Sequence, residues 1–491
     1  MDRDEEFIDL NGIEELELTE EMEQSIGSLE SYPKVLRDWI DSASDVSTMN
    51  EVPVAMAFMS LLSTICSDMV AVRFKRNVED CRIHFCWIQT TGSGKSTLFN
   101  FLGPVTTELY TRINALENNS KLDVVDVKDF TTAALIGNAV EDGKDEDGNT
   151  QYRENIGILA GSGMLAFDEF ENVGVFKSHN HKEGLVGHLN TMMNTLWGQN
   201  YVIKKKLTNG PYINCDSRRS IYATTYPPKN LQEVIADTGL LQRMVLYVRE
   251  TTDMEKDRMM MNLIEAIGVE EDITLPIEKY SNALFKIFTT LKERNLELRQ
   301  DNPEMTDTEV ALGMMTFKDE VRDLMKFEYY NMVEFLRGSR EEVKETTDKF
   351  TARLFVNLTK MSVLMSICEA PGIRDKNKRY VVSARNVRQA SKLIRQCYIA
   401  LVSWLDVALR ERRQSIVENA GINKWKEAFE ESMKDNEGVV LKTDLIIKFM
   451  ELTRQSRPPA FRMFKKVSEL FEEKKVGKSP YIKWKVIDNE V

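Results

Sequence analysis

The sequence has little that would send the protein out of the cell or into a membrane. Its six cysteines form no Cys-x-x-Cys pair, and its start lacks the basic and apolar regions of a signal peptide. The most apolar stretch, residues 52–72, is broken by serine, threonine and aspartate, so it is too polar to span a bilayer. His179 and His181 have no cysteine nearby, which argues for a surface loop rather than a zinc site. We therefore expect a reduced cytoplasmic protein, associated with the nucleoid or, if viral, present in the host cell.

The chain is long enough for several domains. It has 491 residues and a mass of 56.5 kDa, with 42% hydrophobic and 29% charged residues and a mean hydropathy of −0.35. These values are ordinary for a folded protein and exclude wholesale disorder. The length favours two to four domains.

Positive charge is scarce overall but unevenly distributed. The net charge of −13 would by itself argue against a polyanionic partner such as DNA. However, residues 1–30 carry twelve carboxylates and one arginine, whereas residues 441–491 carry twelve lysines and arginines against seven carboxylates. A basic terminal region can contact phosphates, so the acidity does not exclude nucleic acid.

A glycine-containing loop between an expected strand and an expected helix carries the main chemical signal. The apolar run 83–88 leads into Gln-Thr-Thr-Gly-Ser-Gly-Lys-Ser-Thr and then into a helical pattern. In such a loop backbone N–H groups surround phosphates, the lysine supplies a charge, and the following serine hydroxyl binds Mg²⁺. Gln89 replaces the usual first glycine, and a chance glycine turn is the alternative. We predict an ATP and Mg²⁺ site that includes Gly92, Ser93, Gly94, Lys95, Ser96 and Thr97.

Two adjacent carboxylates end a second apolar strand. Residues 163–167 lead into Asp168 and Glu169, which we expect to hold Mg²⁺ and to act as the general base, respectively. The alternative is a strand that runs into a solvated acidic turn. A third apolar strand, 220–225, ends in two threonines, of which Thr225, with Thr224 as second choice, is the candidate contact for the γ-phosphate or the attacking water. Arg243 precedes a fourth apolar strand and is the candidate arginine finger supplied in trans.

This ordered set of motifs resembles AAA+ ATPases of the minichromosome-maintenance helicase branch. The resemblance implies an α/β AAA+ P-loop core, a parallel sheet with helices on both faces, followed by a helical lid, and assembly into a ring, most simply a homo-hexamer. Residues 32–40 and the expected helix 54–69 are also similar to the entry region of a phage and plasmid P-loop ATPase family often fused to primases. The Arg-Leu match at Arg353 makes it the second-sensor candidate, with Arg385 and Arg388 as competitors. A primase or other replication protein is an implied partner.

Two hairpins of that helicase branch have counterparts here. In the insert 130–160 we expect a helix over 130–140, a turn over 141–149 and a returning segment. In the segment 200–214 a strand, an Asn-Gly turn and a second strand carry Lys204, Lys205 and Lys206, which the resemblance places in a DNA-gripping pore hairpin. A solvated edge strand is the alternative.

Two departures from that branch are visible. Tyr226 stands where its sensor asparagine would be, and fewer than 80 residues precede the first ATPase strand. The branch's amino-terminal oligonucleotide-binding and zinc modules would not fit in that length. We therefore expect a compact relative of viral or plasmid type.

The carboxy-terminal residues 415–491 read as helix, strand, two helices and two strands, the order of a winged helix. Its helix from 459 carries basic residues that we expect to contact DNA, with protein docking as the alternative: Arg462, Lys465 and Lys466. In segment 1–30 acidic residues alternate with apolar ones, a composition typical of disordered segments. Such a segment can dock on a partner or on the protein's own DNA site, or it can serve only to keep the protein soluble.

The expected organisation has five parts: the tail 1–30, a helical region 31–80, the ATPase core 81–250, a helical lid region 251–414 and the winged helix 415–491. The leading hypothesis is a ring-forming, ATP-driven DNA helicase or translocase that replicates a virus or plasmid, with single-stranded DNA in the pore and a duplex or fork at the winged helix. The alternatives are an ATP-dependent replication initiator or helicase loader, and an AAA+ protein remodeller.

Overall fold

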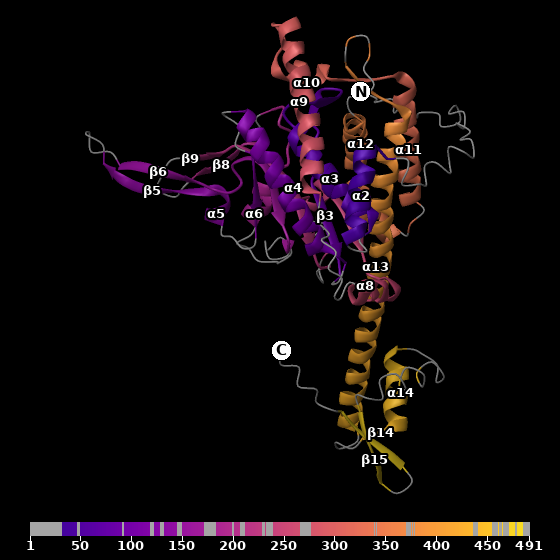
Figure 1. Ribbon diagram of the computed structural model, residues 1–491. Coiled ribbons are helices and arrows are strands. Elements are labelled where there is room, and N and C mark those ends of the chain that lie inside the picture. Colours follow the sequence, from indigo (N-terminus) through magenta and orange to yellow (C-terminus); the bar gives the residue numbers. More distant parts are fainter. Residues whose placement is uncertain are drawn as a thin grey trace, which may run out of the picture. The chain divides into compact units, whose positions relative to one another are not determined.

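In the computed structural model the chain divides into two compact units, 1–405 and 406–491 (Figure 1). The described residues are 32–46, 50–90, 93–117, 122–127, 132–144, 150–170, 183–198, 201–206, 212–227, 231, 239–265, 276–337, 339, 341–369, 375, 377, 379–435, 440–453, 460, 464, 471–476 and 479–484.

A five-stranded parallel sheet organises the first unit. Its spatial order is β11-β3-β10-β7-β4, and every neighbouring pair is parallel. The four strands other than the edge strand β4 are largely buried and rich in apolar residues, as expected of a parallel sheet covered by helices. The predicted α/β class is thus confirmed. The strand bounds are β3 Phe85–Gln89, β4 Leu122–Asp126, β7 Gly161–Phe167, β10 Ser217–Thr225 and β11 Val245–Arg249.

Helices α3 and α4 pack close to this sheet. Helix α4 (Lys95–Leu116) follows β3, and α6 (Glu183–Met192) packs on β10. Every residue of α3 (Glu51–Cys66) except Glu51 is buried, and the helix packs on three strands of the sheet. The polar residues of this stretch are bonded inside the core. The Ser63 hydroxyl accepts the Ile83 N–H at 3.0 Å, and Thr64 bonds the Ser220 hydroxyl.

An aromatic cluster joins the amino-terminal helices to a helix of the predicted lid. Trp39 of α2 (Lys34–Val46) stacks on Phe101 at a centroid distance of 4.3 Å and meets Tyr280 edge-on at 5.2 Å. The Trp39 indole N–H donates to the Val54 carbonyl oxygen at 2.9 Å. Because Tyr280 belongs to α9, the region 31–80 and this helix share one core with the sheet.

The remaining helices of this unit follow the sheet in sequence. Two short strands, β12 (Met315–Phe317) and β13 (Tyr380–Val382), pair in parallel among them. The helices are α8 Asp253–Glu265, α9 Ile277–Asp301, α10 Asp307–Gly313, α11 Asp319–Arg337, α12 Glu341–Cys368 and α13 Ala384–Asp435.

Among the described residues of this unit, three antiparallel hairpins lie outside the parallel sheet, and Figure 1 shows two of them extending away from the helices. They are β1–β2 (Ala71–Phe74, Asn77–Asp80), β5–β6 (Gly137–Lys144, Thr150–Ile156) and β8–β9 (Ile203–Lys206, Tyr212–Cys215). The expected helix over 130–140 is wrong in extent, since α5 covers only Thr132–Ile136. Gly137 ends it with a φ of +105°, and a Cβ there would lie 2.3 Å from the Asn155 carbonyl oxygen. Only glycine fits that turn from helix into strand.

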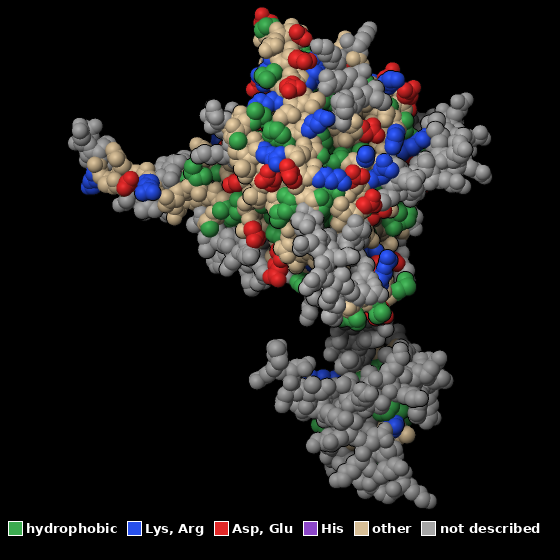
Figure 2. Space-filling view, viewed as in Figure 1, with side chains coloured by type: hydrophobic (Ala, Val, Ile, Leu, Met, Phe, Trp, Pro, Cys, Tyr) green, Lys and Arg blue, Asp and Glu red, His purple; other side chains and the backbone are tan. Residues whose placement is uncertain are grey.

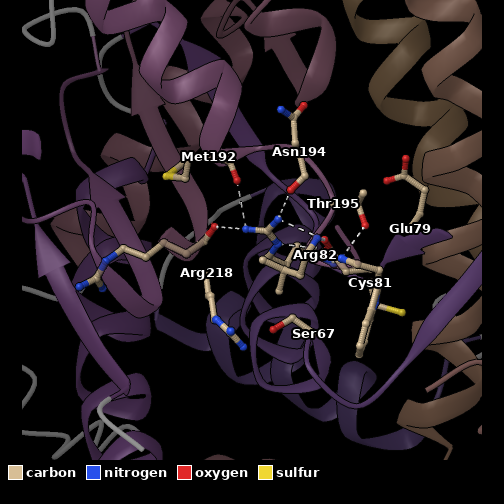
Figure 3. Close-up of polar contacts among 12 residues, drawn as sticks. Ser67, Glu79, Cys81, Arg82, Met192, Asn194, Thr195 and Arg218 are labelled. Carbon is tan, nitrogen blue, oxygen red and sulfur yellow. Dashed lines mark hydrogen bonds and ion pairs between the residues drawn. The ribbon is translucent and has the colours of Figure 1, made fainter. Parts of the chain in front are cut away.

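A fully buried ion pair fastens the start of β3 to its surroundings (Figure 3). The Arg82 guanidinium forms a 3.1 Å ion pair with Asp80 and donates to the carbonyl oxygens of Met192, Arg219 and Asn194 at 3.3, 2.9 and 2.6 Å. Together with its two bonds to the Asp80 carboxylate, these contacts occupy all five guanidinium N–H groups. Burial would raise the pKa of Asp80, but the charges of Arg82 and Lys360 and the hydrogen bonds hold it well below its usual value.

The second unit has its own small core. Trp425 stacks on Phe449 at 3.7 Å and meets Phe464 edge-on. Helix α14 (Lys442–Thr453) and a three-stranded antiparallel sheet in the order β14-β16-β15 complete the described part. These strands are β14 Val440–Leu441, β15 Phe471–Val476 and β16 Ser479–Trp484. The expected break at 410–414 is wrong, because α13 continues through it to Asp435 and spans the boundary between the units.

None of the described helices is long and apolar enough to cross a membrane. All six cysteines are free and buried.

Candidate functional site: a phosphate-binding loop at the carboxyl edge of the sheet

The predicted strand, loop and helix around residue 90 are confirmed. β3 ends at Gln89, and α4 begins at Lys95 after Gly94, which has a φ of +80°. That left-handed conformation favours glycine and turns the backbone into the helix. Ser96 is exposed and Thr97 half-buried in the first turn of α4, where N–H groups without helical partners can bind an anion. The predicted Gly92 lies outside the described residues.

The Lys95 ammonium bridges the ends of the loop. Its Nζ atom donates to the carbonyl oxygens of Gln89 at 2.5 Å and Thr90 at 3.0 Å, and to the Ser93 hydroxyl at 3.1 Å. It also lies 4.6 Å from the centre of the Tyr226 ring, a cation–π contact. Lys95 and Ser93 are both buried. The lysine charge is thus held at the loop, where a bound phosphate would meet it.

Gln89, which replaces the first glycine of the usual loop, forms a side-chain latch. Its Oε1 accepts the Trp87 indole N–H at 2.7 Å, and its Nε2 donates to the Thr251 hydroxyl at 3.1 Å. The Thr90 hydroxyl bonds the Thr251 hydroxyl at 3.0 Å, and the Thr251 N–H donates back to Thr90 at 3.2 Å. These bonds tie the loop entry to the segment that leaves β11. No sequence pattern pointed to Thr251, since only the tertiary fold brings it beside residue 89.

The acidic pair lies at the end of β7, on the far side of β10 from the loop strand. Asp168 is half-buried and Glu169 exposed directly after Phe167. The Thr224 hydroxyl donates to the Asp168 carbonyl oxygen at 2.6 Å and lies 3.2 Å from its Oδ1 atom. Thr224 thereby holds the backbone of Asp168 and lies beside its carboxylate.

The two candidate threonines have different surroundings. Both are fully buried, but the Thr225 hydroxyl donates to the carbonyl oxygen of Tyr226 at 3.3 Å. Thr224, the second choice on sequence grounds, is the one in recorded contact with Asp168. The ring of Tyr226 lies over the Lys95 ammonium.

The carboxyl edge of the sheet brings these groups together. β3, β10 and β7 are parallel neighbours, so the loop, the threonines and the acidic pair all follow strand ends on one edge, where open α/β sheets bind ligands. Two strand spacings separate β3 from β7, about 10 Å. That gap leaves room for a phosphate with its metal ion between Ser96 and Asp168. The left-handed glycine, the helix start and the serine and carboxylate oxygens suit a Mg²⁺–nucleotide.

The two candidate arginines lie at the opposite edge. Arg243 ends the 3₁₀ turn Leu241–Arg243 just before β11, whose Val245 N–H donates to the His84 carbonyl oxygen at 2.8 Å. Its Nη1 donates to Gly239 O at 2.9 Å and to Asn190 Oδ1 at 3.2 Å. Burial and then the charge of Arg353 lower the pKa of Arg243, and Arg353 also contributes to the lowered pKa of buried His84. Helix α12, which contains Arg353, packs on the 3₁₀ turn that ends at Arg243, so the two arginines are neighbours near the amino edge of the sheet.

The competing arginines lie elsewhere. Arg385 is exposed near the start of α13, 3.8 Å from a carboxylate oxygen of Glu369, and Arg388 is half-buried one turn further along. The proximity to Arg243 sets Arg353 apart from them.

The predicted DNA-contacting residues are described in part. β8 contains all three hairpin lysines and pairs with β9, so the strand prediction is confirmed, and the Lys204 side chain is exposed. The side chains of Lys205 and Lys206, and all of Arg462, Lys465 and Lys466, lie outside the described part of the chain. Within that part no cluster of three or more metal-ligating side chains occurs.

A scan against protein-family models finds no match to this chain, and no curated protein matches it either. The assignment of the site therefore depends on its own geometry.

Proposed function

We propose that the protein is a ring-forming, ATP-driven DNA helicase or translocase of a virus or plasmid. The proposal depends on one observation: the phosphate loop and Arg243 lie at opposite edges of the same sheet. The phosphate loop follows Gln89 at the carboxyl edge, while Arg243 precedes the amino end of β11. From Phe85 to Gln89 the strand rises about 13 Å, further than an arginine side chain reaches. Arg243 can serve a nucleotide only on another subunit, which favours a ring.

Within one site each residue has a defined task. Bound ATP with Mg²⁺ supplies the transferable phosphoryl group and a cation that neutralises its charge. Lys95 and the start of α4 hold the phosphates, Ser96 and Asp168 offer oxygen ligands, and exposed Glu169 takes a proton from the attacking water. Arg243 and Arg353 of the neighbouring subunit would stabilise the charge that develops on the phosphate oxygens.

The β8–β9 hairpin supports DNA as the substrate. It leaves the sheet directly before β10, the strand that carries Thr224, and places Lys204 in solvent. β9 ends at Cys215 and β10 begins at Ser217, so movement of β10 with the nucleotide state would reach the hairpin through a single connecting residue. Cations on such a hairpin suit backbone phosphates of a single strand.

The direct test measures ATP hydrolysis and strand separation by the full chain with single-stranded, duplex and forked DNA at several salt concentrations. We expect hydrolysis that DNA stimulates, stimulation that salt weakens, and unwinding of the fork. Lys95→Ala should abolish hydrolysis. Changing Lys204, Lys205 and Lys206 to alanine should remove the stimulation but spare basal hydrolysis, whereas Lys75→Ala with Arg76→Ala, on the exposed turn of another hairpin, should change neither.

Other outcomes would contradict the proposal. DNA-stimulated hydrolysis with neither unwinding of the fork nor movement along single-stranded DNA would favour an initiator or loader. Stimulation that survives loss of the three hairpin lysines would favour a protein remodeller.

A further inference from the structure

A pocket of about 540 Å³ lies outside the nucleotide site, between α2, α9, the end of α12 and the start of α13. Its volume is within the range of ligand-binding pockets, about 300–1,000 Å³. Apolar side chains form part of its wall, among them Val35, Ile287 and Cys368. The pocket can therefore accept side chains with apolar character.

Its charged residues are mostly basic. Two carboxylates of the wall are paired: Asp38 lies 3.2 Å from Lys279, and Glu369 lies 3.8 Å from Arg385. No carboxylate partner is recorded within the described residues for the other three cations, Lys34, Arg37 and Lys286. On the face shown in Figure 2, lysine and arginine side chains lie among carboxylates around α9. The wall thus has a surplus of three positive charges and favours an acidic occupant.

The chain itself contains a segment of matching chemistry next to the pocket. Tyr32, Pro33 and Lys34 form part of the wall, and the acidic segment 1–30 precedes them directly. Within it, residues 14–23 carry six glutamates and three apolar side chains, Leu16, Leu18 and Met22. We propose that residues 14–23 dock in this pocket of the same chain, with glutamates at Lys34, Arg37 and Lys286 and the apolar side chains against the wall.

Because residues 14–23 are covalently joined to the pocket wall, even a weak contact between them and the pocket is favourable. Residues 24–31 join the segment to the wall, and a flexible linker of that length has a root-mean-square span of about 15 Å. A segment tethered so closely is present at a millimolar effective concentration. Because the contact is largely ionic and near solvent, salt should weaken it. Docking of residues 14–23 in the pocket does not require ATPase activity.

The test uses the full chain with a photo-crosslinking amino acid in place of Leu18. After illumination, mass spectrometry locates the crosslinked peptides, and a mixture of isotope-labelled and unlabelled protein separates crosslinks within a chain from those between chains. We expect intrachain crosslinks to segments 32–38 and 279–290. Their yield should fall about tenfold in Arg37→Glu with Lys286→Glu, which reverses one half-buried and one exposed charge of the wall.

Two controls keep the outcome interpretable. Lys75→Glu with Arg76→Glu reverses the same number of exposed charges away from the pocket and should leave the yield unchanged. Changing Glu17 and Glu20 to lysine in the pocket variant should restore it. Crosslinks to the β8–β9 hairpin, to the second unit or to a neighbouring chain would overturn the inference, and so would a yield that the pocket variant leaves unchanged.

Discussion

The opposite placement of Lys95 and Arg243 predicts that two inactive variants complement each other. Lys95→Ala removes the loop cation, and Arg243→Ala removes the finger that a neighbour supplies. Each variant alone should lose turnover by at least about 10³-fold, the usual effect of an arginine finger. Arg243→Ala should still bind ATP, because its own loop is intact and lies about 13 Å or more away along β3.

Mixing the variants should restore part of the activity. A working site needs an intact loop on one subunit and an intact arginine on the next. In an equal, randomly exchanged mixture half of the loops are intact, and half of those adjoin an intact arginine. Independent sites would then give about 25% of the wild-type rate, whatever the number of subunits. If Arg243 acted within its own subunit, no mixture would recover.

The assay follows ATP hydrolysis at saturating DNA after the subunits have exchanged. The two variants carry different tags, and their co-purification shows that mixed rings have formed. A mixture of Lys95→Ala with the Lys95→Ala, Arg243→Ala double variant serves as the control, since no subunit in it has an intact loop and no activity should return. Co-purified rings without recovery would refute the assignment across subunits, as would normal turnover by Arg243→Ala alone.

Four further predictions follow from the described contacts. Gln89→Leu removes both hydrogen bonds of the Gln89 side chain, each worth about 0.5–1.5 kcal/mol. The KM for ATP should therefore rise by about tenfold, and an unchanged KM would show that these bonds do not position the loop. Thr224→Val should lower kcat more than Thr225→Val does, because the Thr224 hydroxyl donates to Asp168 whereas the Thr225 hydroxyl donates to Tyr226. Arg82→Met leaves the buried Asp80 carboxylate without its ion-pair partner. The free energy of unfolding of the first unit, measured with denaturant, should fall by about 3–5 kcal/mol. Adding Asp80→Asn should recover part of that loss. The lowered pKa of Asp80 means that its contribution is fully present above about pH 4 and is lost as the pH falls further, so the stabilities of wild type and Asp80→Asn should converge in acid.

Local patterns sufficed for the elements that carry the nucleotide site. The apolar run before residue 89 and the glycines after it predict strand, loop and helix because they reflect alternation and backbone freedom, which are properties of neighbouring residues. The same holds for the β8–β9 hairpin, where an Asn-Gly pair separates two strand-forming runs.

Two predictions failed for identifiable reasons. The helix over 130–140 stops at Ile136 because the Asn155 backbone, almost twenty residues away in sequence, closes on Gly137. The polar stretch 410–414 resembled a linker, yet α13 passes through it, since arginine, glutamate and glutamine are good helix formers.

The sequence by itself determined the chemistry at each strand end: a lysine after glycine, two carboxylates after an apolar strand, an arginine before another. Only the tertiary structure decided which of them can act together, because strand order and direction set the edge at which each group emerges. Parallel pairing of β3, β10 and β7 gathers the loop, Thr224 and Asp168 at the carboxyl edge, and the same pairing carries Arg243 to the opposite edge. Residue spacing along the chain contains no information on that separation, whereas hydrogen bonding between distant strands fixes it.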